Sequence, residues 1–333
     1  MSDLIIACIV FLTSLGATWV CTPYAMKKMR EARITGVDVH KPSKPVLPEM
    51  GGISILIGLS ITVVLTYFLL PGFQVESLVF LAVVLIAGLI GAVDDLRVLH
   101  PIAKPILTAF ACLPILIFQT YWPHPLIPLV GHHGVRLTLV YPLLIPLAIA
   151  IPANAVNMMD PLNGVMAGTC SIVVVVLFIC AILFGHYETA ILCAGFLGCL
   201  VAFYWYNKYP ARVFAGDVGS LAVGAGIGAL AVIGRLEVVG IIALMPQIMN
   251  SFYGLVSMKG LYERREIVAR PIVVLKSGRL AASKDPKAPI TLTRMLLAEC
   301  PLTEPAMIRL FFILSAFCGG LAILTAVIML VIP

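Results

Sequence analysis

A pair of adjacent carboxylates closes a long apolar run in the stretch GAVDDLRVLHPIAK, residues 91–104. Asp94 and Asp95 stand where this run meets polar sequence, and Lys104 follows Asp94 by ten positions. Ionised side chains close to hydrocarbon are costly and tend to mark function. Like charges side by side repel each other unless a cation compensates, and Lys104 is a candidate for that role. The stretch therefore indicates charge chemistry at the end of an apolar segment.

Two further segments carry the same residue types. They read NAVNMMDPLNG (154–164) and YPARVFAGDVGS (209–220), and their polar members are Asn154, Asn157, Asp160, Asn163 and Asp217. Carboxylate and amide oxygens are hard ligands that suit Mg²⁺ or Mn²⁺. Phosphoryl transfer needs a metal ion, basic side chains on the phosphate oxygens and a carboxylate near the nucleophile. The three segments together favour a phosphoryl-transfer site, provided that they lie at one membrane surface.

The composition indicates which elements must position these residues. Of the 333 residues, 61% are hydrophobic and only 11% are charged, against about 25% charged in a typical soluble domain. The chain is therefore expected to be a single all-α integral membrane domain, residues 1–333. Ten apolar runs are long enough to cross the bilayer: 3–23, 51–71, 77–93, 104–121, 138–153, 166–184, 189–206, 218–234, 237–257 and 308–332.

The basic residues predict the orientation. With ten spans the loops alternate between two sides, and nearly all lysines and arginines fall on one side, including the large loop near 258–307. The other side receives only Arg136 and Arg235. The positive-inside rule puts the basic side in the cytoplasm and both termini outside. The net charge of +6 is then a consequence of topology and does not indicate nucleic-acid binding.

Two other features have simpler interpretations. The segment 123–140 has apolar arms around Gly-His-His-Gly and predicts a small extracytoplasmic β-hairpin. His132 and His133 are interpreted as turn residues rather than as metal ligands, because adjacent residues do not share a face. The nine cysteines form no CxxC pair, which favours apolar packing over a metal cluster.

The polar segments resemble a known family. AVDDLRVLHPIAK, NAVNMMDPLNG and FAGDVGS are similar, in order and spacing, to three signature loops of the polyprenyl-phosphate N-acetylhexosamine-1-phosphate transferases, glycosyltransferase family 4. GVDVHKPSKPVLPEMGG (36–52) and the segments 270–280 and 288–312 resemble the UDP-N-acetylglucosamine:dolichyl-phosphate N-acetylglucosamine-1-phosphate transferases of eukaryotes and archaea. Asn163 stands where the bacterial phospho-N-acetylmuramoyl-pentapeptide transferase has an acidic residue. The likeness runs from about residue 20 to residue 325.

The resemblance implies an activity and a location. It implies transfer of N-acetylglucosamine-1-phosphate from UDP-N-acetylglucosamine to a polyprenyl (dolichyl) phosphate, with release of UMP and dependence on Mg²⁺, or on Mn²⁺ in its place. This reaction is the first step of lipid-linked oligosaccharide and N-glycan assembly. The site would open to the cytoplasmic face of an archaeal-type prokaryotic plasma membrane, or of the endoplasmic reticulum in a eukaryote. A homodimer is compatible with the sequence, which does not decide the oligomeric state.

The resemblance also assigns residues. It implies Mg²⁺ ligands at Asn157 and Asp217, an acidic pair beside the lipid phosphate at Asp94 (which takes its proton) and Asp95, a phosphate-binding Lys104, uracil contacts at Asn163 and Phe214, and nucleoside contacts at Val39 and Glu49. The family's arginine cluster in the large loop is out of register here, so Arg270, Arg264 and Arg265 are the candidates for the pyrophosphate and sugar.

Two alternatives compete with this assignment. A related transferase could use another UDP-sugar or undecaprenyl phosphate in cell-envelope glycan synthesis. An ion-coupled transporter would carry its acids near the bilayer midplane in broken helices, whereas here they cluster at the ends of apolar runs. Direct attack by the lipid phosphate and a route through an aspartyl-phosphate both fit the residues, and direct attack is preferred.

Overall fold

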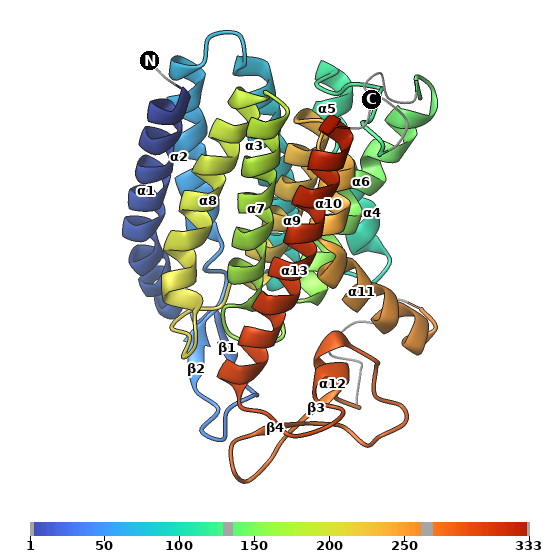
Figure 1. Ribbon diagram of the computed structural model, residues 1–333. Helices are drawn as coiled ribbons and strands as arrows, with labels where there is room; N and C mark the ends of the chain where they lie inside the picture. Colours follow the sequence, from blue (N-terminus) through green and yellow to red (C-terminus); the bar gives the residue numbers. More distant parts are fainter. Residues whose placement is uncertain (1–2, 129–135, 261–268, 332–333) are drawn as a thin grey trace.

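The computed structural model describes residues 3–128, 136–260 and 269–331 of the chain (Figure 1). Its helices are α1 (Asp3–Glu31), α2 (Ile53–Leu69), α3 (Gln74–Leu96), α4 (Ala103–Phe110), α5 (Leu113–Phe118), α6 (Val140–Met158), α7 (Val165–Leu183), α8 (Tyr187–Asn207), α9 (Gly216–Ile233), α10 (Glu237–Ala243), α11 (Met245–Met258), α12 (Leu292–Leu296) and α13 (Glu304–Val331). The all-α membrane fold predicted from composition is confirmed.

The predicted number of ten spans is wrong for the described residues. Seven helices there are long and apolar enough to cross a membrane: α1, α3, α6, α7, α8, α9 and α13. Counting α10 and α11 together gives eight, although the two helices meet at a bend of 66°. The runs predicted at 51–71 and 104–121 form apolar helices that are shorter than a span.

Proline and glycine explain these differences. The α2 helix has 17 residues because Pro71 and Gly72 follow it, and Gly72 adopts a positive φ of 98°. Pro114 lies in the first turn of α5, and Pro246 lies in the first turn of α11. Proline lacks the N–H that a continuous helix needs and is tolerated mainly in a first turn. The first run therefore ends at a Pro-Gly turn, and the other two runs break where a proline lies in the first turn of a new helix.

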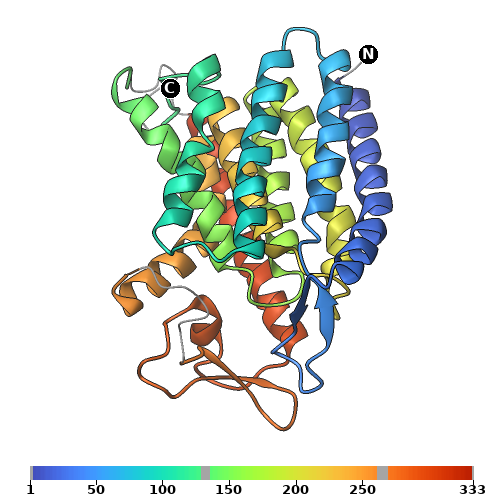
Figure 2. The ribbon, with the colours of Figure 1, turned by 180° about the vertical axis from the view of Figure 1, so that it is seen from behind.

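The polar segments gather at one end of the bundle. In the loop between α1 and α2, β1 (Thr35–Val37) pairs antiparallel with β2 (Val46–Pro48). In the large loop before α13, β3 (Ile272–Val274) pairs antiparallel with β4 (Leu280–Ala282). Figures 1 and 2 show both hairpins and α12 at the end of the molecule opposite to the start of α1 and the end of α13. This arrangement agrees with the prediction that both termini share one side and the polar loops the other.

The hairpin predicted at 123–140 is not found in the described part of that segment. Residues 123–128 and 136–139 contain no strand, and one backbone bond joins their two arms, from the Leu137 N–H to the Pro123 carbonyl at 2.9 Å. Residues 129–135, with His132 and His133, lie outside the described residues. Both strand pairs that the structure does contain lie at the other end, in segments predicted only as loops.

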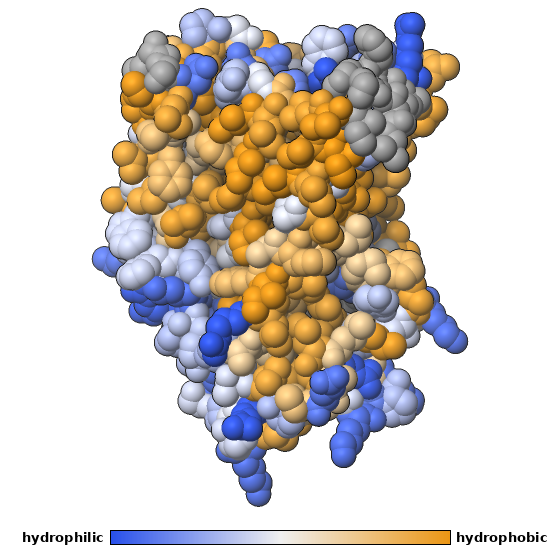
Figure 3. Space-filling view, in the orientation of Figure 1, coloured by the Kyte–Doolittle hydropathy of each residue, from blue (hydrophilic) through white to orange (hydrophobic). Residues whose placement is uncertain are grey.

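The α9 helix is the centre of the bundle. Every residue from Val218 to Ile233 is buried, and the helix packs against α3 and α6. A helix that is apolar on all sides is buried in this way. The outer helices instead present apolar side chains to the surroundings, and Figure 3 shows them covering the middle of the visible face, with hydrophilic residues gathered below. The fold therefore holds the first turn of α9 rigidly at the polar end.

Candidate active site

Four helix ends bring together the acidic residues predicted from sequence. Asp94 and Asp95 lie in the last turn of α3, Asn157 in the last turn of α6, Lys104 in the first turn of α4 and Asp217 in the first turn of α9. Hydrogen bonds and ion pairs connect all five side chains directly or through the α9 backbone. The prediction that three distant segments meet at one end of the molecule is thus matched by the geometry. We call these five residues the acidic site.

Lys104 is the hub of the acidic site. Its Nζ lies 2.5 Å from Asp217 Oδ2 and forms a second ion pair with Asp94 Oδ2. Asp94 is buried and its other oxygen accepts from the Leu99 N–H at 2.7 Å. One ammonium pairs with two carboxylates, those of Asp94 and Asp217, so this group of three side chains keeps an excess of negative charge that favours a further cation.

Asp95 has a different environment from Asp94. Its Oδ1 accepts from the Asp217 N–H at 2.8 Å and its Oδ2 accepts from the Val218 N–H at 3.0 Å. A carboxylate at a helix N-terminus satisfies unpaired backbone donors and interacts favourably with the helix dipole. Asp95 therefore fixes the first turn of α9, and with it Asp217. Asp95 was predicted as one of the acidic pair beside the lipid phosphate, and these bonds give it a positioning role.

Glycines allow α3 and α9 to approach this closely. A Cβ on Gly91 would lie 2.2 Å from the Asp217 carbonyl oxygen, far inside van der Waals contact. Gly216 adopts a positive φ of 71°, and a Cβ there would meet Asp95 Oδ2 at 2.6 Å. Only glycine fits both positions without displacing a backbone.

The residues predicted as metal ligands are adjacent. Asn157 Nδ2 donates to Asp217 Oδ1 and to Ser220 Oγ, each at 2.8 Å. These bonds orient the amide, whose Oδ1 is the atom that a metal would bind. Among the described residues, no group of three or more His, Cys, Asp or Glu side chains could hold a metal ion. One carboxylate and one amide oxygen nevertheless fit Mg²⁺, which completes its shell with water and substrate phosphates.

Glu49 and Phe214 lie together next to the acidic site. A Cβ on Gly36 would meet Glu49 Oε2 at 3.2 Å and Phe214 Cδ2 at 3.3 Å, so both side chains pack over this glycine. Backbone bonds from Phe214 to Pro48 and from Gly51 to Phe214 hold the two segments together. Glu49 is close enough to Asp95 for the two charges to interact.

The other predicted nucleotide contacts are placed differently. The Val39 side chain is 47% exposed, so it does not line a closed site. Asn163 is buried and contacts Asp38, Lys41 and Glu304. Sequence reasoning missed Glu304 as a site residue. The available signal was its place in the first turn of an apolar helix, the same place that Asp217 occupies in α9.

The arginines of the large loop are not joined to the acidic site in the described residues. Arg270 has an exposed side chain just before β3. Arg264 and Arg265 lie outside the described residues. The expectation that one of the three binds the pyrophosphate or the sugar stays a prediction.

Two asparagine side chains hold α4 and α11 in place: Asn154, which the sequence analysis grouped with the site residues, and Asn250, which it missed. Asn154 Nδ2 donates to Thr108 Oγ1 at 2.8 Å and ties α6 to the helix that carries Lys104. Asn250 Nδ2 donates to the Met158 carbonyl at 3.0 Å, and its Oδ1 accepts from the Leu292 N–H at 2.9 Å. Asn250 thereby ties the end of α6 to α12 in the large loop.

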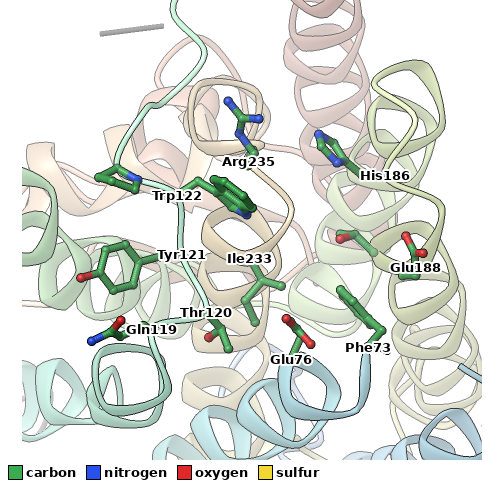
Figure 4. A pocket seen from close by; sticks show the side chains of 12 residues that line it. Phe73, Glu76, Gln119, Thr120, Tyr121, Trp122, His186, Glu188, Ile233 and Arg235 are labelled. Carbon is green, nitrogen blue, oxygen red and sulfur yellow. The ribbon is translucent and has the colours of Figure 1, made fainter. Parts of the chain in front are cut away.

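A cavity of about 510 Å³ lies at the other end of the bundle and contains none of the predicted site residues. Figure 4 shows Trp122, Arg235, His186 and Glu76 around it. Burial, with a smaller contribution from the Arg235 charge, lowers the pKa of His186. This cavity is separate from the chemistry of the acidic site.

Comparison with known proteins shows the family of the chain. The sequence profile described as glycosyl transferase family 4 matches residues 77–235, which include Asp94, Asp95, Lys104, Asn157 and Asp217. A Methanocaldococcus jannaschii protein named as a glycosyltransferase is 30% identical over 311 residues, 92% of each chain. The chain belongs to glycosyl transferase family 4.

Other known proteins are similar over shorter stretches. A Saccharolobus solfataricus protein named as a UDP-N-acetylglucosamine–dolichyl-phosphate N-acetylglucosaminephosphotransferase is 30% identical, covering 72% of this chain and 74% of its own. The phospho-N-acetylmuramoyl-pentapeptide-transferase of Desulforudis audaxviator is 33% identical, covering 57% of this chain and 63% of its own. As a member of glycosyl transferase family 4, the protein is a membrane-embedded sugar-phosphate transferase.

Proposed function

We propose that the protein transfers N-acetylglucosamine-1-phosphate from UDP-N-acetylglucosamine to a polyprenyl (dolichyl) phosphate and releases UMP. The observation that carries the proposal is the meeting of Asp94, Lys104, Asn157 and Asp217 at one end of the bundle. The name of the Saccharolobus solfataricus relative supports this choice of sugar nucleotide and lipid. This reaction would be the first step of lipid-linked glycan assembly.

Asn157 and Asp217 would hold the divalent cation in this proposal. The adjacency of the Asn157 and Asp217 side chains and the excess negative charge around Lys104 support this assignment. When bound, Mg²⁺ would neutralise charge on the diphosphate and polarise its phosphorus–oxygen bonds. Mn²⁺ has a similar preference for oxygen ligands and would substitute for it.

The remaining residues act on the two anionic substrates. An oxygen of the lipid phosphate attacks the phosphorus that carries the sugar, the bond from this phosphorus to the bridging oxygen breaks, and UMP leaves with that oxygen. Asp94 accepts the proton that the lipid phosphate carries, and Lys104 offsets the charge of the approaching phosphates. Asp94 is already bound to Lys104 and to the Leu99 N–H, which lowers its nucleophilicity. Direct attack therefore fits better than an aspartyl-phosphate.

Asn163 and Phe214 would contact the uracil, and Glu49 and Val39 would contact the nucleoside. The packing of Phe214 and Glu49 over Gly36 and the interaction of Glu49 with Asp95 support a nucleotide that extends from the acidic site towards β1 and β2. Arg270, Arg264 and Arg265 are proposed as further contacts. The concentration of Lys and Arg in the loops at this end supports a cytoplasmic site. A homodimer remains part of the proposal.

A second candidate follows from the bacterial relatives. Identities of 33% to proteins named as phospho-N-acetylmuramoyl-pentapeptide-transferases favour a related reaction with another UDP-sugar or with undecaprenyl phosphate. The acidic site would act identically in both reactions. The two functions therefore differ only in the sugar and the lipid.

A substrate comparison tests the proposal. Detergent-purified protein is incubated with Mg²⁺, a dolichyl or undecaprenyl phosphate, and either UDP-N-acetylglucosamine or UDP-N-acetylmuramoyl-pentapeptide. The expected products are UMP and the lipid-linked N-acetylglucosamine phosphate, and Asp217→Ala should abolish both. Turnover with the pentapeptide substrate alone would replace the first candidate by the second. Absence of turnover with either donor would refute both.

A further inference from the structure

The cavity of about 510 Å³ at the end of the bundle opposite to the acidic site has a polar lining that the transfer reaction does not use. Glu76, which lines it, lies in the first turn of α3, whereas Asp94 lies in the last turn. A rise of about 1.5 Å per residue separates the two by about 27 Å along the helix. Sites for small ligands have volumes of about 300–1,000 Å³. The cavity is therefore large enough for a ligand of its own.

Two polar groups in the lining have no partner. The Thr120 side chain is 8% exposed, and its Oγ1 is buried without a hydrogen bond among the described residues. Arg235 Nε is buried in the same way, although Arg235 Nη2 donates to the His124 carbonyl at 3.1 Å. Leaving a buried donor unsatisfied costs free energy. Both side chains line the cavity (Figure 4), so a ligand with acceptor oxygens would satisfy both donors.

The charges that line the cavity are separated and do not balance. Its described lining contains the carboxylates of Glu76 and Glu188 and the guanidinium of Arg235. Neither glutamate forms an ion pair with a described residue. Burial, with a smaller contribution from Arg235, lowers the pKa of His186, so this imidazole is neutral near pH 7. Figure 4 shows Arg235 and Glu76 at opposite edges. The cavity thus offers a negative side, a positive side and one negative charge in excess.

Aromatic side chains add a surface for a cation. Tyr121 and Trp122 both line the cavity, and Trp122 is 60% exposed. The Arg235 guanidinium carbon lies 5.7 Å from the centre of the Trp122 ring, which shows that a cation is accommodated beside this ring. Ammonium groups bind to aromatic faces in the same way. Tyrosine and tryptophan are also enriched at the depth of the lipid headgroups, where the apolar helices of this bundle end.

We propose that this cavity binds a zwitterionic aminoalkyl phosphate, with its ammonium group at Glu76 and Glu188 and its phosphate at Arg235 and Thr120. The phosphate oxygens accept from Arg235 Nε–H and from the Thr120 hydroxyl, and the ammonium group donates to the two carboxylates. The headgroup of an ethanolamine phospholipid and free phosphoethanolamine share this chemistry. The inference does not depend on the proposed function, because no residue of the acidic site takes part in it.

Titration calorimetry on the detergent-purified full-length protein in EDTA tests the two ends of the ligand separately. Phosphoethanolamine should bind more tightly than ethanolamine or inorganic phosphate. Glu76→Gln should weaken both phosphoethanolamine and ethanolamine, by about tenfold. Arg235→Gln should weaken phosphoethanolamine by a similar factor without weakening ethanolamine. Asp3→Asn removes an exposed carboxylate at the same end of the bundle, outside the cavity, and should leave every affinity unchanged.

Two further variants separate binding from folding. Thr120→Val removes a buried hydroxyl that has no partner, so the Tm without ligand should not fall, whereas the affinity for phosphoethanolamine should. A lower Tm with unchanged affinity would show a structural role and overturn the assignment of Thr120. If Glu76→Gln does not fold, Glu188→Gln changes an exposed carboxylate of the same cavity and should weaken the same two ligands.

Nanodiscs distinguish the two sources of the ligand. A higher Tm in phosphatidylethanolamine than in phosphatidylglycerol, lost in Glu76→Gln, would identify the lipid headgroup. Binding of phosphoethanolamine without a difference between the two lipids would identify a free zwitterion. If neither effect is seen, or if both persist in Glu76→Gln and Arg235→Gln, the inference is wrong. Turnover of UDP-N-acetylglucosamine, measured separately, would leave the proposed function standing in that case.

Discussion

The carboxylate of Asp95 spans the gap between two helices and accepts from the backbone N–H of Asp217 at 2.8 Å. Its second oxygen accepts from the Val218 N–H, so α3 caps α9 with a side chain that also stands next to Asp94 in sequence. Two neighbouring acids therefore have separate tasks. Asp94 faces Lys104, and Asp95 holds the helix that carries Asp217.

Asp95→Asn should lower stability, because the new amide group would point a donor at one of the two backbone donors. We expect a loss of about 1–3 kcal/mol in the free energy of unfolding, seen as a lower Tm in detergent. Asp94→Asn should instead slow turnover far more than it weakens UMP binding, with a smaller change in Tm. Equal Tm changes in the two variants would contradict the division of tasks.

Lys104→Met should remove most activity, because no other ammonium in the described residues pairs with both Asp94 and Asp217. By analogy with other charge-stabilising groups, we expect kcat to fall by about 10²–10³. Steady-state release of UMP measures the effect. Lys287→Met, in an exposed turn of the large loop, is the matched control and should retain wild-type rates.

Removal of divalent ions should abolish turnover, and Mg²⁺ or Mn²⁺ should restore it. Binding to the folded state also raises stability by mass action, so Mg²⁺ with UMP should raise the Tm of the wild type. In Asp217→Ala this rise should disappear because one of the two proposed protein ligands is lost. A rise of equal size in the variant would show that the cation binds elsewhere.

Gly91→Ala should loosen the contact between α3 and α9, since the added methyl group would lie 2.2 Å from the Asp217 carbonyl oxygen. Overpacking of this kind costs about 1–3 kcal/mol, and the shift of Asp94 relative to Asp217 should also slow turnover. Gly320→Ala places the same methyl group where nothing lies within 4 Å. Its Tm and rate should match those of the wild type.

His186 should make stability depend on pH at the opposite end of the molecule. Burial lowers the pKa of His186 in the folded protein, so the unfolded chain binds the proton more readily. Its contribution is therefore complete above the unfolded pKa, near 6.5, and is lost as the pH falls through the lower folded value. The Tm of His186→Gln should consequently fall less than that of the wild type between pH 7.5 and pH 5.5, as scanning calorimetry would measure. Parallel curves would contradict the prediction.

Much of this site could be predicted because its charged residues stand out against the apolar sequence around them. Asp94, Asp95 and Asp217 stand at the ends of apolar runs, and this contrast can be read along the chain. The division between Asp94 and Asp95 could not be predicted, because it depends on which of two adjacent carboxylates points at α9. Glu304 was missed for a similar reason: its partners Lys41 and Asn163 are far away in sequence.

For the fold as well, features set by local sequence could be predicted, whereas features that depend on contacts between distant residues could not. Hydrophobic runs located most of the helices, including α6 with Pro146 and Pro152 inside it. Run length alone did not reveal that Pro246 ends a helix and turns the chain by 66°. Short strands such as β1 and β2 have three residues each, too few for a periodic pattern. Their pairing depends on the segments that they bring together.

The meeting of four helix ends also decides how far each reactant must travel. A sugar nucleotide is soluble in water, whereas an isoprenoid chain is soluble in the membrane interior. Moving either molecule fully into the other's phase would cost a large solvation free energy. Because Asp94, Lys104, Asn157 and Asp217 stand at the depth where the apolar helices give way to loops, the reacting phosphates can meet while each partner's tail remains in the phase it prefers.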